Sequence, residues 1–170
     1  IEAAYEKAFA ADSLSAFGGI VALNRPCSNA IAEAISKIFM EVVIAPEFTE
    51  EAKAIFAAKP NLRLLTMPLM NEAKFEMRYI TGAMLMQERD TQVLTAADLQ
   101  CVTERKPTQT EIDSLLFAWR LVKHIKSNAI LIAKDNQTVG VGAGQVSRVD
   151  AVELALKKAG DRLQETVLAS

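Results

Sequence analysis

Short apolar runs of strand length alternate with helical segments through the first 65 residues, and this alternation constrains the fold more than any other feature. Val, Ile, Leu and Ala fill the runs at residues 20–23, 42–45 and 62–65, and Pro46 closes the second. Between the first two runs, residues 28–39 place Ile and Phe at helical spacing. The pattern predicts an α/β fold with a largely parallel or mixed sheet.

Two shorter helices complete this part of the chain. Residues 3–11 are rich in alanine and predict a helix that ends near Asp12, where Ser13 and the Phe17-Gly18-Gly19 stretch turn the chain. Thr49 is a suitable N-cap for a short helix whose inner face carries alanine, isoleucine and phenylalanine.

The second half has the clearest local signals. Thr108 and Glu111 form a capping box directly before an apolar helix, and Ser147 with Asp150 repeats that pattern before the last helix. An apolar run at residues 129–134, a polar turn and a return run at residues 138–142 predict a β-hairpin.

The middle of the chain is less regular. Residues 67–79 have mixed polarity and are predicted to be a connecting loop. The apolar runs at residues 83–87 and 99–103 have the length of strands, and the second is expected to tie the two halves together.

The overall charge and the cysteines narrow the functional class. The net charge is −2 and no block of Lys and Arg occurs, so a nucleic-acid partner has no support. No apolar run approaches the length of a membrane span, and the start of the chain does not resemble a signal peptide. Cys27 and Cys101 are isolated, which favours two buried thiols in a reducing compartment over a disulfide or a metal site.

A glycine-rich stretch at residues 139–145 connects the hairpin to the last helix. Alternating glycines at that place allow either a tight strand-to-helix turn or the approach of backbone amides to an anion, and composition alone favours the turn. The spacing fits neither the dinucleotide fingerprint nor the Walker motif. Arg148 adds a fixed positive charge at the start of the helix, which raises the chance of an anionic ligand.

Other polar residues have both a structural and a functional interpretation. Asn128 lies between a helix and a strand, where asparagine is usually a C-cap, although it can also present an amide to a ligand. His124 is the only histidine and is better explained as a cation in the last turn of a helix than as a general base. Glu41 lies at the mouth of a strand, where most glutamates are simply solvated.

Several long motifs, in order along the chain, are similar to those of the AICAR transformylase family. The strongest is Val-Gly-Val-Gly-Ala-Gly-Gln-Val-Ser-Arg-Val at the start of the last helix. The others lie at residues 4–9, 12–25, 41–46, 59–65, 103–108, 117–120 and 122–130. The likeness is weakest between residues 67 and 87.

The resemblance implies formyl transfer from 10-formyltetrahydrofolate to the exocyclic amine of AICAR, giving FAICAR in de novo purine (IMP) biosynthesis. In the full enzyme a second domain then closes the ring to IMP. The implied fold is α/β, with cytidine-deaminase-like subdomains at about residues 1–80 and 81–170 and a mixed sheet flanked by helices. The implied enzyme is a cytoplasmic homodimer with active sites across its interface, and AICAR and folate are its partners.

The resemblance also assigns roles to residues of this sequence. Gly18 and Glu41 would contact the AICAR nucleotide. Asn128 would bind AICAR from the other side of the site and help to orient the reacting amine, which makes it the catalytic candidate. Arg148 and Val149 lie where the family binds folate, and Ser127 falls in a stretch where the family binds potassium.

The sequence also departs from the family. The catalytic Lys-His pair of a Lys-His-x-Asn-Pro-Cys-Gly-like motif does not occur, and neither does a Phe-Phe-Pro-Phe stretch. We therefore expect a fragment with weak binding and little activity of its own. Lys123-His124 belongs to the Lys-Ser-Asn motif and is not that catalytic pair.

Two alternatives stay open. A zinc nucleoside deaminase would need a Pro-Cys-x-x-Cys pair, which this sequence lacks. A non-catalytic nucleotide-binding or dimerisation module would need no catalytic pair at all.

Overall fold

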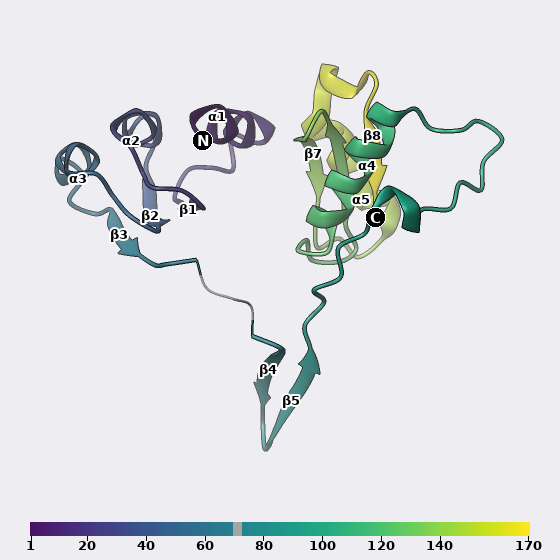
Figure 1. Cartoon of the computed structure of the whole chain (residues 1–170), viewed down its shortest axis with the longest axis horizontal. Helices are drawn as coiled ribbons and strands as arrows, with labels where there is room; N and C mark the ends of the chain where they lie inside the picture. Colours follow the sequence, from purple (N-terminus) through teal and green to yellow (C-terminus); the bar gives the residue numbers. More distant parts are fainter. Residues whose placement is uncertain (70–72) are drawn as a thin grey trace.

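Two separate three-stranded sheets, joined by a long two-stranded hairpin, organise the computed structural model, which describes residues 1–69 and 73–170 (Figure 1). The first sheet contains β1 (Gly19–Ala22), β2 (Met40–Ala45) and β3 (Arg63–Thr66), all parallel and in that order. The chain is therefore a mixed α/β protein, although its parallel and antiparallel strands lie in different sheets.

Two helices of the first part pack on one side of the parallel sheet. They are α2 (Asn29–Ser36) and α3 (Glu50–Ala57). Ile31 and Ile35 of α2 and Phe56 of α3 form one buried cluster with Val43 of β2. The Thr49 hydroxyl accepts a hydrogen bond from the Ala52 amide at 3.2 Å, which confirms the predicted N-cap. The predicted helix over residues 28–39 is shorter than expected, because it already ends at Ser36.

The second sheet has the order β7-β6-β8 and is antiparallel throughout. Its strands are β6 (Ile130–Lys134), β7 (Gln137–Gly142) and β8 (Val167–Ala169), so the predicted hairpin is confirmed. The helix α4 (Gln109–Val122) covers one side and α5 (Arg148–Ala159) covers the other. The short 3₁₀ helix η2 (Gly160–Leu163) follows α5.

The capping box before α4 forms as predicted. The Thr108 hydroxyl accepts from the Glu111 amide, and the Glu111 carboxylate accepts from the Thr108 amide. Hydrogen bonds from the Arg105 guanidinium and from the Thr108 amide lower the pKa of Glu111 to about 2. Ser147 caps α5 through the Asp150 amide, while the return bond of the predicted second box is not formed.

The N-terminal helix α1 (Glu2–Ala11) connects the two parts. Arg162 donates to the Ala10 carbonyl at 2.8 Å, and Lys158 pairs with Asp12 at 2.5 Å. The hydrogen bond from Lys158 lowers the pKa of Asp12. On its other side, α1 is joined to the start of α2 by a hydrogen bond from Ser28 to Glu2.

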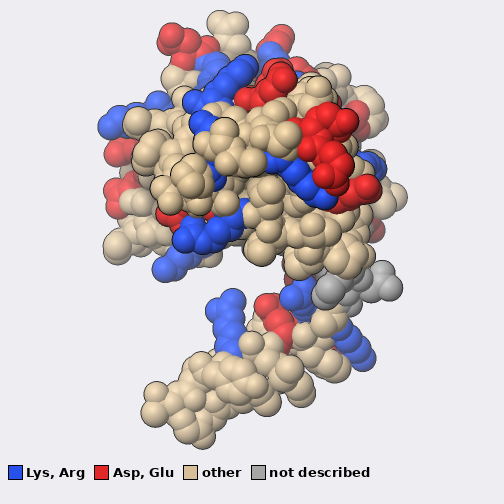
Figure 2. Space-filling model, turned by 90° about the vertical axis from the view of Figure 1, so that its left-hand side faces the viewer, with Lys and Arg blue, Asp and Glu red and all other residues tan. Residues whose placement is uncertain are grey.

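The strands β4 (Phe75–Ile80) and β5 (Ala83–Glu88) pair antiparallel in a hairpin that projects from both sheets (Figure 1). Its outer end carries no Lys, Arg, Asp or Glu on the face seen in Figure 2. β5 confirms the strand predicted at residues 83–87. The prediction of a loop over residues 67–79 is wrong for Phe75 to Tyr79, which belong to β4. These residues pair with β5, which begins directly after the turn at Gly82. Residues 70–72 of the predicted loop lie outside the described chain.

Two other expectations also fail. Residues 99–103 are not a strand, since no strand of the described residues pairs with them, and a short 3₁₀ helix, η1 (Ala96–Asp98), precedes them. Cys27 is buried, as expected of a structural thiol, but Cys101 is exposed.

Within the described residues, no helix is both long enough and apolar enough to cross a bilayer.

Candidate functional site

Asn128 lies in the connection between α4 and β6 and holds two loops together. Its side-chain amide nitrogen donates to the carbonyls of Gln145 at 3.1 Å and Val146 at 2.9 Å. Its backbone amide also donates to the Gln145 carbonyl, and Gly144 donates to Lys126 at 2.7 Å. The predicted C-cap role is therefore replaced by a bridge to the segment that leads into α5.

The glycines of that segment are explained by helix packing. A Cβ atom built at Gly140 would collide with the Ala155 carbonyl, and one at Gly142 would collide with the Ala151 carbonyl. The small side chains of α5 that face the sheet are fully buried, so β7 and α5 approach closely. The preferred interpretation, a tight strand-to-helix connection, is confirmed, and Gly144 supplies a φ of +65° within it.

The first turn of α5 presents a mixed surface. Arg148 is exposed, and its guanidinium donates to the hydroxyl of Ser170, beyond the end of β8. Val146 is 98% exposed and Val149 65% exposed, so two apolar side chains stand in solvent beside this arginine. A cation beside exposed apolar groups suits an amphipathic anionic ligand.

Ser127, Asn128 and Arg148 line one cavity of about 290 Å³. Lys123 stands at its edge and donates to the Asp90 carbonyl at 2.8 Å, which holds the segment after β5 against α4. The complete lining is Asp90, Trp119, Val122, Lys123, Ile125, Ser127, Asn128, Ala129, Arg148 and Ser170. Two cations and one carboxylate give the cavity a net positive lining.

Sequence reasoning missed some of these residues. Trp119 lies on α4 and Lys123, four residues later, is the C-cap of that helix, so the spacing already places both on one side of it. Asp90 had no sequence signal, because it reaches the cavity only through the fold. His124 is exposed and does not line the cavity, which agrees with its interpretation as a residue of the helix end.

Gly18 and Glu41 form a second group, at the amino-terminal edge of the parallel sheet. Gly18 has a φ of +73°, and its amide donates to the Phe39 carbonyl at 2.9 Å. The next glycine, Gly19, pairs with Met40, which brings Gly18 close to the exposed Glu41. The rings of Phe17 and Phe39 lie 5.3 Å apart beside them.

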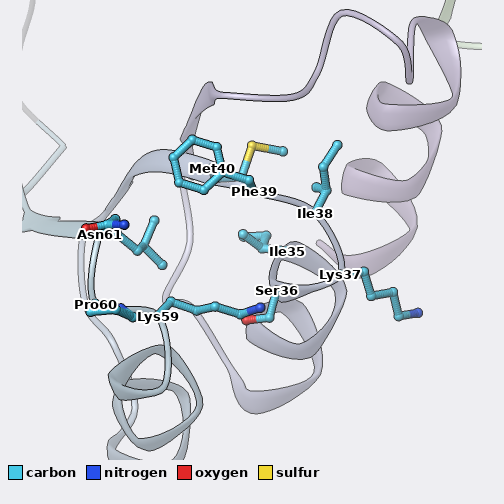
Figure 3. Close-up of a pocket in the computed structure, with 10 residues that line it drawn as sticks. Ile35, Ser36, Lys37, Ile38, Phe39, Met40, Lys59, Pro60 and Asn61 are labelled. Atoms are coloured by element: carbon cyan, nitrogen blue, oxygen red, sulfur yellow. The ribbon is translucent and has the colours of Figure 1, made fainter.

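A cavity of about 200 Å³ adjoins this second group, between the ends of α2 and α3 (Figure 3). Phe39 and Met40 line it, and Lys59 extends along it toward Ser36, while Lys37 points away (Figure 3). The Ser36 hydroxyl is buried and has no hydrogen-bond partner among the described residues.

The structure thus gathers the predicted residues into two groups. Ser127, Asn128 and Arg148 share a cavity, with Val149 beside them, whereas Gly18 and Glu41 lie at the first sheet. No hydrogen bond or ion pair between described side chains joins the groups. In residues 1–69 and 73–170, no group of three or more His, Cys, Asp or Glu is placed to hold a metal ion.

Comparison with known proteins adds an independent result. Residues 1–158 match the family described as AICARFT/IMPCHase bienzyme. A "Bifunctional purine biosynthesis protein PurH" of Oceanobacillus iheyensis is 49% identical over 172 residues, which cover all of this chain and 34% of that protein. Proteins of the same name from Anoxybacillus flavithermus and Dinoroseobacter shibae are 51% and 53% identical over 100% and 93% of the chain, and over 34% and 30% of their own lengths. The chain therefore spans about a third of the length of these relatives.

Proposed function

Since this chain belongs to the AICARFT/IMPCHase bienzyme family, we propose that it forms part of the transformylase site of a purine biosynthesis enzyme. The reaction is formyl transfer from 10-formyltetrahydrofolate to the exocyclic amine of AICAR, and it gives FAICAR. The amine nitrogen forms a bond to the formyl carbon and gives up a proton, while the bond between that carbon and N10 of the folate breaks and N10 takes up a proton. The parent enzyme then closes the ring to IMP.

The orientation of Asn128 carries this proposal. Both described bonds of its side chain are donated by the amide nitrogen, to the carbonyls of Gln145 and Val146. The side-chain oxygen is thereby left to accept a hydrogen bond from a ligand. An acceptor fixed in this way can bind an N–H of the AICAR amine and direct its lone pair toward the formyl carbon.

The surroundings of Asn128 support a folate role for the start of α5. Arg148 supplies a cation for the glutamate carboxylates of the folate, and Val149 supplies apolar contact area beside it. Ser127, in the same cavity, belongs to the stretch proposed for potassium. The hydroxyl and carbonyl oxygens of the connection between α4 and β6 would be the ligands of such a potassium ion, because hard cations prefer oxygen ligands.

Gly18 and Glu41 are proposed to contact the nucleotide in an active site shared between two copies. Support comes from the placement of the two groups, since Gly18 and Glu41 lie at the parallel sheet and Asn128 lies before β6 of the antiparallel sheet. A cytoplasmic homodimer would bring the first group of one copy to the second group of its partner. Cytidine-deaminase-like subdomains, divided near residue 80, belong to the same proposal.

The general acid–base pair is proposed to lie elsewhere in the parent polypeptide, because its Lys-His motif does not occur in residues 1–170. The test is a graft in which this chain replaces the matching 172 residues of the Oceanobacillus iheyensis protein. FAICAR formation from AICAR and 10-formyltetrahydrofolate is the expected result. A folded graft that makes no FAICAR would overturn the proposal.

The absent motif also favours a second candidate, a non-catalytic module that binds nucleotide or supports dimerisation. Calorimetric titration of AICAR into the isolated chain distinguishes the two. Micromolar binding would favour the self-sufficient module, and no heat would favour an incomplete half-site.

A further inference from the structure

One side of the parallel sheet is covered and the other is not. Residues that pair across parallel strands point to the same side, and Val21, Val43 and Leu64 point toward α2 and α3. The opposite side carries the residues that alternate with them. We call this side the uncovered face, and it consists of Ile20, Ala22, Val42, Ile44, Arg63 and Leu65.

The uncovered face is apolar and open to solvent. Ile20 is 65% exposed and Leu65 is 51% exposed, and they flank Val42 and Ile44 of the central strand. In Figure 1 the helices of this part all lie on the other side of β1, β2 and β3. Arg63 pairs with Val42 and adds a positive charge to this face, and its described hydrogen bond, to the Asn61 carbonyl, is long at 3.4 Å.

The second sheet shows what a completed sheet of this chain looks like. Leu131 and Ala133 pack under α4, while Ile130 and Ile132 pack under α5, so helices bury both sides. Parallel sheets are almost always buried on both faces, more strictly than antiparallel ones. The first sheet is parallel, yet the described part of the chain places a helix layer on one side of it only.

We propose that the uncovered face is a docking surface for an amphipathic α-helix from the polypeptide that family members carry outside this stretch. The matched residues make up only 34% of the Oceanobacillus iheyensis protein, so ample chain exists to supply such a helix. A helix is the element expected, because crossover helices cover the faces of parallel sheets. An acidic residue at the edge of its apolar side would pair with Arg63.

This inference concerns the assembly of the parent protein and goes beyond the proposed reaction. It can therefore fail while formyl transfer is confirmed, or hold while formyl transfer fails. A second copy of this chain is the competing occupant, and the experiment below separates it.

The test uses single cysteines in a Cys101→Ser background, since Cys27 is buried. Ile20→Cys and Leu65→Cys place thiols on the uncovered face, and Ala54→Cys on the exposed side of α3 is the matched control. Thiol labelling is compared between the isolated chain and the graft. We expect residues 20 and 65 to label freely in the isolated chain and at least about tenfold more slowly in the graft, while residue 54 labels alike in both.

Equal labelling of residues 20 and 65 in the two proteins would overturn the proposal. Protection already in the isolated chain, together with a dimer in sedimentation equilibrium, would assign the face to a second copy and would also overturn it. Photo-crosslinking from a benzoylphenylalanine at Leu65 in the graft is an independent measurement. It should capture a peptide outside this chain with apolar residues at helical spacing, and capture of a peptide from within the chain would contradict the proposal.

Discussion

Replacing Gly142 with alanine tests the close approach of β7 and α5 directly. A Cβ at this position overlaps the backbone of Ala151, including its carbonyl carbon at 2.8 Å. Backbone atoms on the side of a helix that packs against a sheet cannot move aside as the end of a flexible side chain can. The helix must shift away from the sheet, and overpacking of this kind costs about 1–3 kcal/mol of unfolding free energy.

Urea denaturation followed by the fluorescence of Trp119 measures this cost. Trp119 is the single tryptophan of the chain, and it lies on α4, which packs against the sheet that contains β7. With an m-value of about 2 kcal/mol/M, the midpoint should fall by about 0.5–1.5 M. Gly82→Asn is the control. Gly82 has a φ of +75° and open space around it, and asparagine tolerates that conformation, so the midpoint should barely change. A Gly142→Ala protein as stable as this control would refute the packing argument.

Three further predictions follow from local structure. Because Arg105 holds the pKa of Glu111 near 2, below its ordinary 4.5, the contribution of this carboxylate is complete above about pH 4.5 and is lost as the pH falls to 2. The Tm difference between the native chain and Glu111→Gln should shrink over that range, and a constant difference would contradict the assignment. Burial raises the pKa of Cys27 to about 11, whereas a hydrogen bond between the Cys101 thiol and the Thr103 side chain lowers the pKa of Cys101. A thiol reagent at pH 8 should therefore modify only Cys101 before denaturant is added. Thr49→Ala should cost about 1 kcal/mol in urea denaturation, and no loss would show that the cap hydrogen bond is dispensable.

Elements set by local chemistry were predictable from the sequence. The caps at Thr49 and Thr108 depend on side chains within three residues, and the hairpin of β6 and β7 joins adjacent segments. The errors concern pairing. Residues 99–103 have apolar character but no partner strand, while β4 has charged residues within it and still forms a strand, because β5 pairs with it across a short turn.

In the candidate site, too, some residues could be predicted from local spacing, whereas others depend on contacts between distant segments. The four-residue spacing of Trp119 on α4 and Lys123 at its C-cap predicts that both side chains lie on the same side of the helix. The bonds from Asn128 to Gln145 and Val146 could not be predicted, because they cross 17 and 18 residues and depend on how α5 meets β7. The family resemblance identified Asn128 without explaining how its amide is oriented.

That orientation leads to the most direct test of the central claim, the rate of FAICAR formation by the graft carrying substitutions at Asn128. Asn128→Asp keeps the shape but replaces the donor with an acceptor that faces two carbonyls, and Asn128→Ala removes both functions. We predict that each lowers kcat by about 10²-fold through lost orientation. The control His124→Ala, at a residue outside the cavity, should leave kcat unchanged. Full activity of Asn128→Ala, or loss of activity in the folded His124→Ala protein, would contradict the account.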